Sequence, residues 1–195
     1  MGDLGKGVSP PLIGGTRLAG NLLRETQIKV EMEVAVLIAW VEALLVAAPG
    51  AWIAIGAFEN IRVPKANRDM VVDVLAMTSM KAQFPDYYAI VSANRIESRR
   101  LQRIAFGAIV VTESVVAVAM LFGALGLAGA GIGLWNAVVP HGIAVAGTLG
   151  FTMVWSGFLV GGQWVHYWIV HQDAQHTHFM LVLWGLATLA LLLLL

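Results

Sequence analysis

The sequence predicts an all-α polytopic membrane protein with four transmembrane helices and an amphipathic helical insertion between helices 1 and 2. Mean hydropathy is +0.77, which is typical of chains that bury their apolar side chains in lipid. Only 12% of the 195 residues are charged, against about 25% in soluble domains. Four apolar runs have about the ~17–25 residues that cross ~30 Å of hydrocarbon. These runs are expected at about 34–58, 103–127, 139–163 and 178–195.

Composition excludes several classes of function. Lys plus Arg equal Asp plus Glu, so nothing indicates a nucleic-acid partner. The absence of cysteine excludes disulfides, iron–sulfur clusters, thiolate zinc sites and cysteine-attached haem. We find no nucleophile constellation, nucleotide motif or broken-helix inverted repeat. The chain is therefore not expected to be an enzyme or a secondary transporter.

The N-terminal residues 1–29 are rich in glycine and proline and are expected to form a tail, ordered either by a partner, which is favoured, or by the chain's own loop. Residues 30–195 are expected to form a single membrane domain. Its first helix, about 34–58, contains Pro49 and Gly50 near its middle, where the lost backbone hydrogen bond predicts a kink.

Two carboxyl groups fall inside predicted membrane helices, Glu42 in the first and Glu113 in the second. An ionisable group at membrane depth costs about 2.5–3.5 kcal/mol on insertion scales, so both side chains should face protein or water. One interpretation is a proton or cation relay; the favoured one is a hydrogen bond to a neighbouring helix. Antiparallel neighbours could bring both carboxyls to similar depth, where they would share a proton.

The polar connection 59–102 is expected to be helical and to lie on the bundle or the membrane surface. Pro64 fits a helix start, Pro85 a first helical turn and Ser98 an N-cap. An apolar stripe at helical spacing follows Pro64 and comprises Met70, Val71, Val74, Leu75 and Thr78. The charged residues of this connection are interpreted as a solvated face, with a binding patch as the alternative.

The third predicted helix, 139–163, has small residues that we assign to one helix-packing face: Ala146, Gly150, Gly157 and Gly161. Small residues let membrane helices approach closely, because lipid provides no hydrophobic force for association. The contact could lie within the bundle or with another chain.

Four histidines occur within a short stretch between the third and fourth helices. Together with a carboxylate they form a candidate site for a divalent metal: His166, His171, Asp173, His176 and His178. Their spacing matches no named metal motif, and histidines at a wet membrane surface are ordinary. His141 begins the third helix at the opposite membrane face and is therefore excluded from this cluster.

Trp164 and Trp168 follow the third helix and are interpreted as aromatic residues of the membrane interface. The alternative is a surface that contacts a quinone head group. The long connection carries more Lys and Arg than the N-terminal residues do, which favours a cytoplasmic connection, although both segments are basic.

Several segments resemble one family of proteins. They read AFENI, DVLAM, RLQRIAFGAIVVTESVVAVAMLFGA and VWSGFLVGGQWVHYW. Over residues 40–190 the chain is similar to the bacterial predicted small integral membrane proteins of unknown function, the DUF2165 family. The most specific element is the pair of glycines and two tryptophans at Gly161, Gly162, Trp164 and Trp168, and the sequence HQDAQHTHF departs from the family pattern. The resemblance implies a four-helix protein of a bacterial inner membrane and no established activity.

Three functions remain as hypotheses. The leading one is a non-catalytic accessory subunit that packs against other subunits of a larger membrane complex, such as a respiratory or other redox assembly. The second is metal or quinone binding at the histidine-rich stretch. The third is permeation of protons or small solutes along Glu42 and Glu113. Lipid is the only other expected ligand.

Overall fold

The computed structural model describes residues 13–195, with side chains from Gly20 onward. The described residues form helices joined by short connections and contain no strand, so the predicted fold class is confirmed. The helices are α1 (Ile13–Arg62), α2 (Pro64–Ala76), α3 (Thr78–Gln83), α4 (Pro85–Val91), α5 (Arg99–Gly131), α6 (Val138–Trp164) and α7 (Gln172–Leu194), with 3₁₀ turns η1 (Ser92–Asn94) and η2 (Tyr167–Ile169).

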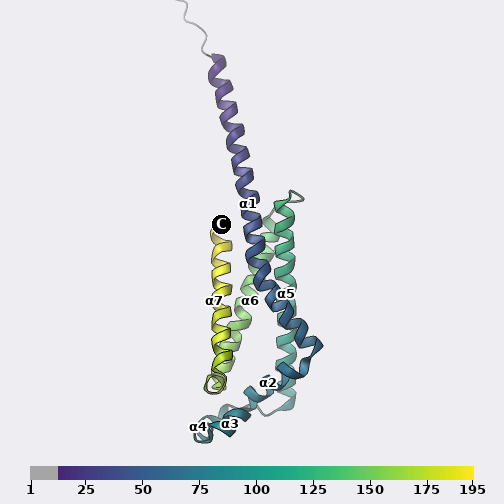
Figure 1. Ribbon diagram of the computed structural model, residues 1–195, viewed down its shortest axis with the longest axis vertical. Helices are drawn as coiled ribbons and strands as arrows, with labels where there is room; N and C mark the ends of the chain where they lie inside the picture. The colour runs from purple at the N-terminus through teal and green to yellow at the C-terminus, as the bar shows by residue number, and fades with distance from the viewer. Residues whose placement is uncertain (1–12) are drawn as a thin grey trace, which may run out of the picture.

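Four of these helices, α1, α5, α6 and α7, are long and apolar enough to cross a membrane. Each packs mainly on the next in the order α1, α5, α6, α7. Figure 1 shows them side by side, with the short helices α2 to α4 gathered at one end and the C-terminus at the other. All four predicted long helices are present, and each begins before its expected first residue.

The first helix is longer than expected. It already runs from Ile13, so the predicted tail and the start at residue 34 are wrong for residues 13–33, while residues 1–12 lie outside the described part. No proline interrupts this stretch, and Leu, Arg, Glu, Gln and Lys are good helix formers. Side chains one turn apart also pair, Gln27 with Glu31 at 3.0 Å and Lys29 with Glu33 at 4.0 Å. In Figure 1 this part of α1 stands clear of the other helices.

Pro49 lies inside α1, and the helix continues through it. The neighbouring Gly50 is where α1 approaches α5 closely, because an added Cβ would lie 3.0 Å from the Cβ of Met120. The Pro49–Gly50 step therefore marks a helix contact inside one continuous helix.

The connection between α1 and α5 is helical, as predicted. Pro64 and Pro85 occupy the first turns of α2 and α4, and Ser98 accepts a hydrogen bond from the Leu101 backbone N–H at 3.4 Å. The predicted apolar stripe is present on α2 except at its end. Thr78 is exposed and begins α3, because Met77 adopts a left-handed conformation (φ 54°) that ends α2.

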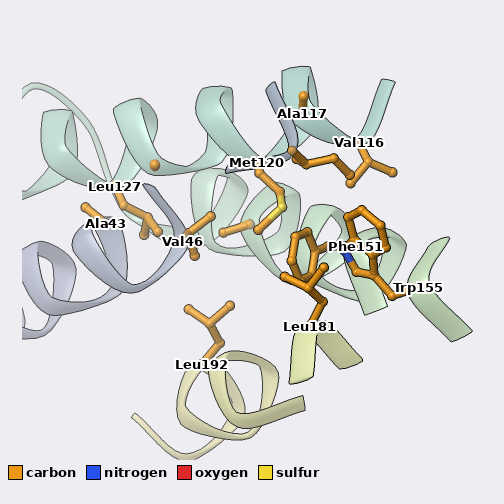
Figure 2. Close-up of a cluster of buried hydrophobic side chains, with 13 residues drawn as sticks. Ala43, Val46, Val116, Ala117, Met120, Leu127, Phe151, Trp155, Leu181 and Leu192 are labelled. Carbon is orange, nitrogen blue, oxygen red and sulfur yellow. The ribbon is translucent and has the colours of Figure 1, made fainter. Parts of the chain in front are cut away.

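Apolar side chains form two separate cores. The bundle core joins all four long helices, and Figure 2 shows Val46 of α1, Met120 of α5, Phe151 of α6 and Leu192 of α7 within it. The cap core joins the short helices to the α6–α7 connection through Met77, Met80, Val165 and Tyr167. The insertion is therefore packed onto the end of the bundle.

The close helix contacts of α6 differ from those predicted. Gly150 does meet α5, since its Cβ would lie 2.9 Å from Val116, but Ala146, Gly157 and Gly161 are exposed. The bundle buries an adjacent face of α6, on which Ala144, Gly147, Thr148, Phe151 and Trp155 lie. Helical period alone identified a face of small residues, whereas the shape of the whole bundle selected the buried face.

Candidate functional site

Glu113 lies on α5 and is hydrogen-bonded to two asparagines in series. Its Oε2 accepts a hydrogen bond from Asn60 Nδ2 of α1 at 2.7 Å. Asn67 Nδ2 of α2 donates in turn to Asn60 Oδ1 at 2.6 Å. Glu113 and Asn60 are both buried and Asn67 is exposed, so this chain of side chains links α2, α1 and α5 from the surface inward.

Glu42 has a different partner at the other end of the bundle. Its Oε1 lies 3.0 Å from Nδ1 of His141, which is on the first turn of α6. The carboxyl side chain is 4% exposed and the imidazole 34% exposed. Sequence reasoning placed His141 at the opposite face from the other histidines but missed it as the partner of Glu42. The available signal was that both residues lie near the N-terminal ends of the predicted membrane helices 34–58 and 139–163, which run in the same direction in an up-and-down bundle.

The two buried carboxyls are far apart. Asn60, the partner of Glu113, is five helical turns beyond Glu42 on α1, which corresponds to about 27 Å at 1.5 Å per residue. The hypothesis that Glu42 and Glu113 lie at similar depth is therefore wrong, and the two cannot share a proton. Each carboxyl is instead hydrogen-bonded to a neighbouring helix, which was the favoured interpretation.

A groove of about 710 Å³ begins beside Glu113. Its walls come from the C-terminal part of α1, from α2 and α5, and from α6, η2 and the first turns of α7. Most lining side chains are apolar, and the polar ones include Asn60, Asn67, Glu113, His171 and His178. This volume and this mixture are typical of small-molecule sites, where a few polar groups orient a ligand in an apolar pocket.

Four nearly parallel rings form one wall of the groove, from Trp155, Phe158, Tyr167 and His178. Phe158 stacks on His178 with centroids 4.8 Å apart and on Trp155 at 5.6 Å, and Tyr167 lies 6.0 Å from His178. The Tyr167 hydroxyl is also 3.2 Å from Nδ1 of His178. Burial raises the pKa of Tyr167 to about 12, so its phenol keeps its proton at neutral pH.

The predicted metal cluster is not assembled. His171 Nε2 lies 3.1 Å from Asp73 Oδ2 of α2, His178 contacts Tyr167, and the His166 ring packs edge-on against Tyr87. Asp173 and His176 are exposed on α7. Within residues 20–195 no three His, Asp or Glu side chains come close enough to hold a metal ion. His171 and His166 contact partners on α2 and α4, which lie far away in the sequence, whereas His178 contacts Tyr167 of η2.

The two interface tryptophans have different environments. Trp164 is 62% exposed at the end of α6, and its backbone carbonyl accepts a hydrogen bond from Asn94 Nδ2 at 2.9 Å. Trp168 packs edge-on against Tyr87 with centroids 6.5 Å apart. Its Nε1 is buried without a hydrogen-bond partner in the described structure. Trp164 thus has the exposure expected of an interface residue, whereas Trp168 is part of the packed cap.

Comparison with known proteins gives one match. A family model described as predicted small integral membrane protein (DUF2165) matches residues 38–195. The matched region contains the four-helix bundle, the α2–α4 insertion and the whole groove, and the protruding first half of α1 lies outside it. No curated protein and no solved structure matches the chain.

Proposed function

Because this chain belongs to the DUF2165 family of predicted small integral membrane proteins and has four apolar helices, we propose that it is a non-catalytic accessory subunit of a larger complex in the bacterial inner membrane. The observation that carries this proposal is the protruding half of α1. Every residue from Gly20 to Leu37 is exposed. Over about 27 Å, at 1.5 Å per residue, this segment lies against no other part of the described chain.

The protruding segment presents an apolar stripe. Leu23, Val30, Val34 and Leu37 follow one another at spacings of seven, four and three residues, which places them on one side of the helix. Leu23 is 72% exposed and Val30 is 53% exposed. An isolated helix of this length is marginal in water, and most helices are stabilised by packing of their apolar face. A helix of another subunit along this stripe supplies that packing.

Charge distribution supports one orientation. The α2–α4 end carries Arg62, Lys65, Arg68, Lys81, Arg95, Arg99, Arg100 and Arg103, more basic residues than the N-terminal segment has. The positive-inside rule then puts this end in the cytoplasm. The protruding part of α1 lies at the opposite end of the bundle (Figure 1), so in this orientation it is on the other side of the membrane.

The proposal is tested by gentle extraction from native membranes, followed by purification and mass spectrometry of every protein held in fixed ratio. We expect at least one stoichiometric membrane subunit. The variant Leu23→Glu/Val30→Glu should reduce its recovery at least tenfold, because charge is introduced into the apolar stripe. Asn21→Glu adds a charge to the opposite side of the same exposed segment and should leave recovery unchanged.

A solitary chain from native membranes would overturn the proposal. Equal recovery of the partner with the double variant and with wild type would show that this stripe does not hold it. If Asn21→Glu lowered recovery of the partner as much as the double variant does, the partner could not be assigned to one side of α1.

A further inference from the structure

We propose that the groove beside Glu113 binds a membrane-dissolved amphiphile with a planar, hydrogen-bonding head group and a hydrocarbon tail, which is the chemistry of quinones and quinols. This inference does not depend on the subunit role, since the groove is formed by the bundle and the insertion alone.

The first wall of the groove offers an acceptor. Glu113 lines the groove and is 5% exposed, and only its Oε2 is hydrogen-bonded within the described residues. Its Oε1 has no donor among these residues and is not sealed by the protein, so it can accept a hydrogen bond from a ligand hydroxyl in the groove.

The opposite wall offers rings. Trp155, Phe158 and His178 lie within 27° of parallel and all line the groove. Offset stacking on such a wall favours a flat aromatic head group over a flexible one. Tyr167 also lines the groove, with its hydroxyl 3.2 Å from His178 Nδ1. This wall therefore supplies aromatic surface for stacking.

The two walls lie at the same depth. Gly150 of α6 meets Val116 of α5. Trp155 is about one turn after Gly150, and Glu113 is about one turn before Val116. Because α5 and α6 are antiparallel, both steps lead in the same direction, and a single head group can contact Glu113 and the rings together.

The rest of the groove suits a tail and excludes a phosphate. Its other lining side chains are mostly apolar, including Met70, Val71, Phe106, Ile109 and Met153. No Lys or Arg is among the lining residues, so the groove offers no cation to pair with a phosphate. Charge therefore favours a neutral head group over a phospholipid. Gly157 and Gly161 also line the groove, and a Cβ at either would meet nothing within 4 Å.

The experiment titrates decylubiquinone and its reduced quinol into the purified full chain in lipid nanodiscs, with calorimetry and tryptophan quenching as readouts. We expect saturable binding of the quinol. Gly157→Leu should weaken it at least tenfold, because the new side chain occupies the groove. Gly107→Leu is the matched control, since Gly107 is an exposed helical glycine with equally open space outside the groove.

Two further variants and a second ligand test which part of the quinol is recognised. Glu113→Gln should weaken the quinol several-fold, whereas Glu42→Gln changes the other buried carboxyl and should have no effect. Decanol, a tail of the same length without a ring, should bind at least tenfold more weakly than the quinol. If Gly157→Leu fails to fold, Gly161→Leu makes the same test from the next turn of α6.

Absence of saturable quinol binding would overturn the proposal. If Gly107→Leu weakened quinol binding as much as Gly157→Leu does, the effect would not come from filling the groove. Equal affinity for decanol would show that the rings do not recognise the head group, and tight binding by Glu113→Gln would remove Glu113 from the site.

Discussion

The two ends of the bundle hold similar carboxyl groups in different surroundings. Glu42 and Glu113 are both buried, and each is hydrogen-bonded to one side chain of a neighbouring helix. The Glu42 end is closed by tight helix packing, whereas the Glu113 end opens into the groove. The spacing of the surrounding helices, and not the acidic residue itself, decides whether a buried carboxyl is structural or can meet a ligand.

Glycines close the first end. A Cβ added at Gly123 would lie 2.8 Å from the Ala144 backbone, and one at Gly126 would lie 2.8 Å from Pro140. Gly131 is equally close to Trp40. The α5–α6 turn is also tied down, because Trp135 Nε1 donates to the Gly126 carbonyl at 2.8 Å. Backbones therefore touch at this end, and van der Waals packing holds the helices together.

Large rings separate the helices at the second end. Trp155 and Phe158 lie on α6 near the level of Glu113. A Cβ added at the nearby Gly157 or Gly161 would meet nothing within 4 Å. The same helix thus packs through small residues in its first half and through aromatic residues in its second. The groove results from this change along α6.

Breaking the closed end should give the largest effect. Gly123→Leu places a side chain against the Ala144 backbone, which cannot move aside, and we expect a loss of about 3 kcal/mol or more in unfolding free energy. Gly107→Leu has open space and should change stability by less than about 0.5 kcal/mol. Unfolding in detergent, followed by circular dichroism, measures both. Similar losses in the two variants would contradict the contrast between a closed face and an exposed one.

Removing the partner of each carboxyl should give a smaller and unequal effect. His141→Leu leaves Glu42 unpaired where no groove adjoins it, and we expect a cost of about 2–3 kcal/mol. Asn60→Leu leaves Glu113 beside the groove, where water can replace the lost donor, so about 1 kcal/mol is expected. The same unfolding measurement compares them. Equal costs, or a larger cost for Asn60→Leu, would show that the groove does not relieve Glu113.

The cap should give the smallest effect and a pH signature. Tyr167→Phe removes the hydroxyl contact with His178 and should cost about 1 kcal/mol. Because burial raises the pKa of Tyr167 from 10.0 to about 12, stability from this group is complete below pH 10 and is lost as pH rises through 12. Ultraviolet titration should show one tyrosine ionising near pH 12, and Tyr167→Phe should abolish that step. A wild-type titration that is unchanged in the variant would contradict the burial of this phenol.

Local features were predictable because they depend on short stretches of sequence. Pro64, Pro85 and Ser98 marked helix starts through their backbone chemistry, and Met70, Val71, Val74 and Leu75 marked the inner side of α2 through their spacing. The protruding half of α1 was missed because glycine and proline in the first residues suggested a tail. The good helix formers between Leu22 and Glu33 prevailed over that signal.

The candidate site was only partly predictable. Glu42 and Glu113 were identified because a carboxyl in an apolar run is rare and needs a partner. The partners were not identified, because Asn60 and Asp73 are ordinary polar residues of a connection in the sequence. His171 and His178 suggested a metal site by their proximity along the chain, but Asp73 and Tyr167 hold them apart.

The sequence by itself determined four apolar helices, an amphipathic insertion and two carboxyls within the membrane. Hydropathy and helical period are properties of neighbouring residues, so they can be read along the chain. Only the tertiary structure decided that His141 pairs with Glu42, that Asn60 pairs with Glu113 and that a groove opens beside one carboxyl and not the other. Those outcomes depend on helix register and separation, which are set by steric contacts between residues far apart in the sequence, such as Gly123 and Ala144 or Gly150 and Val116.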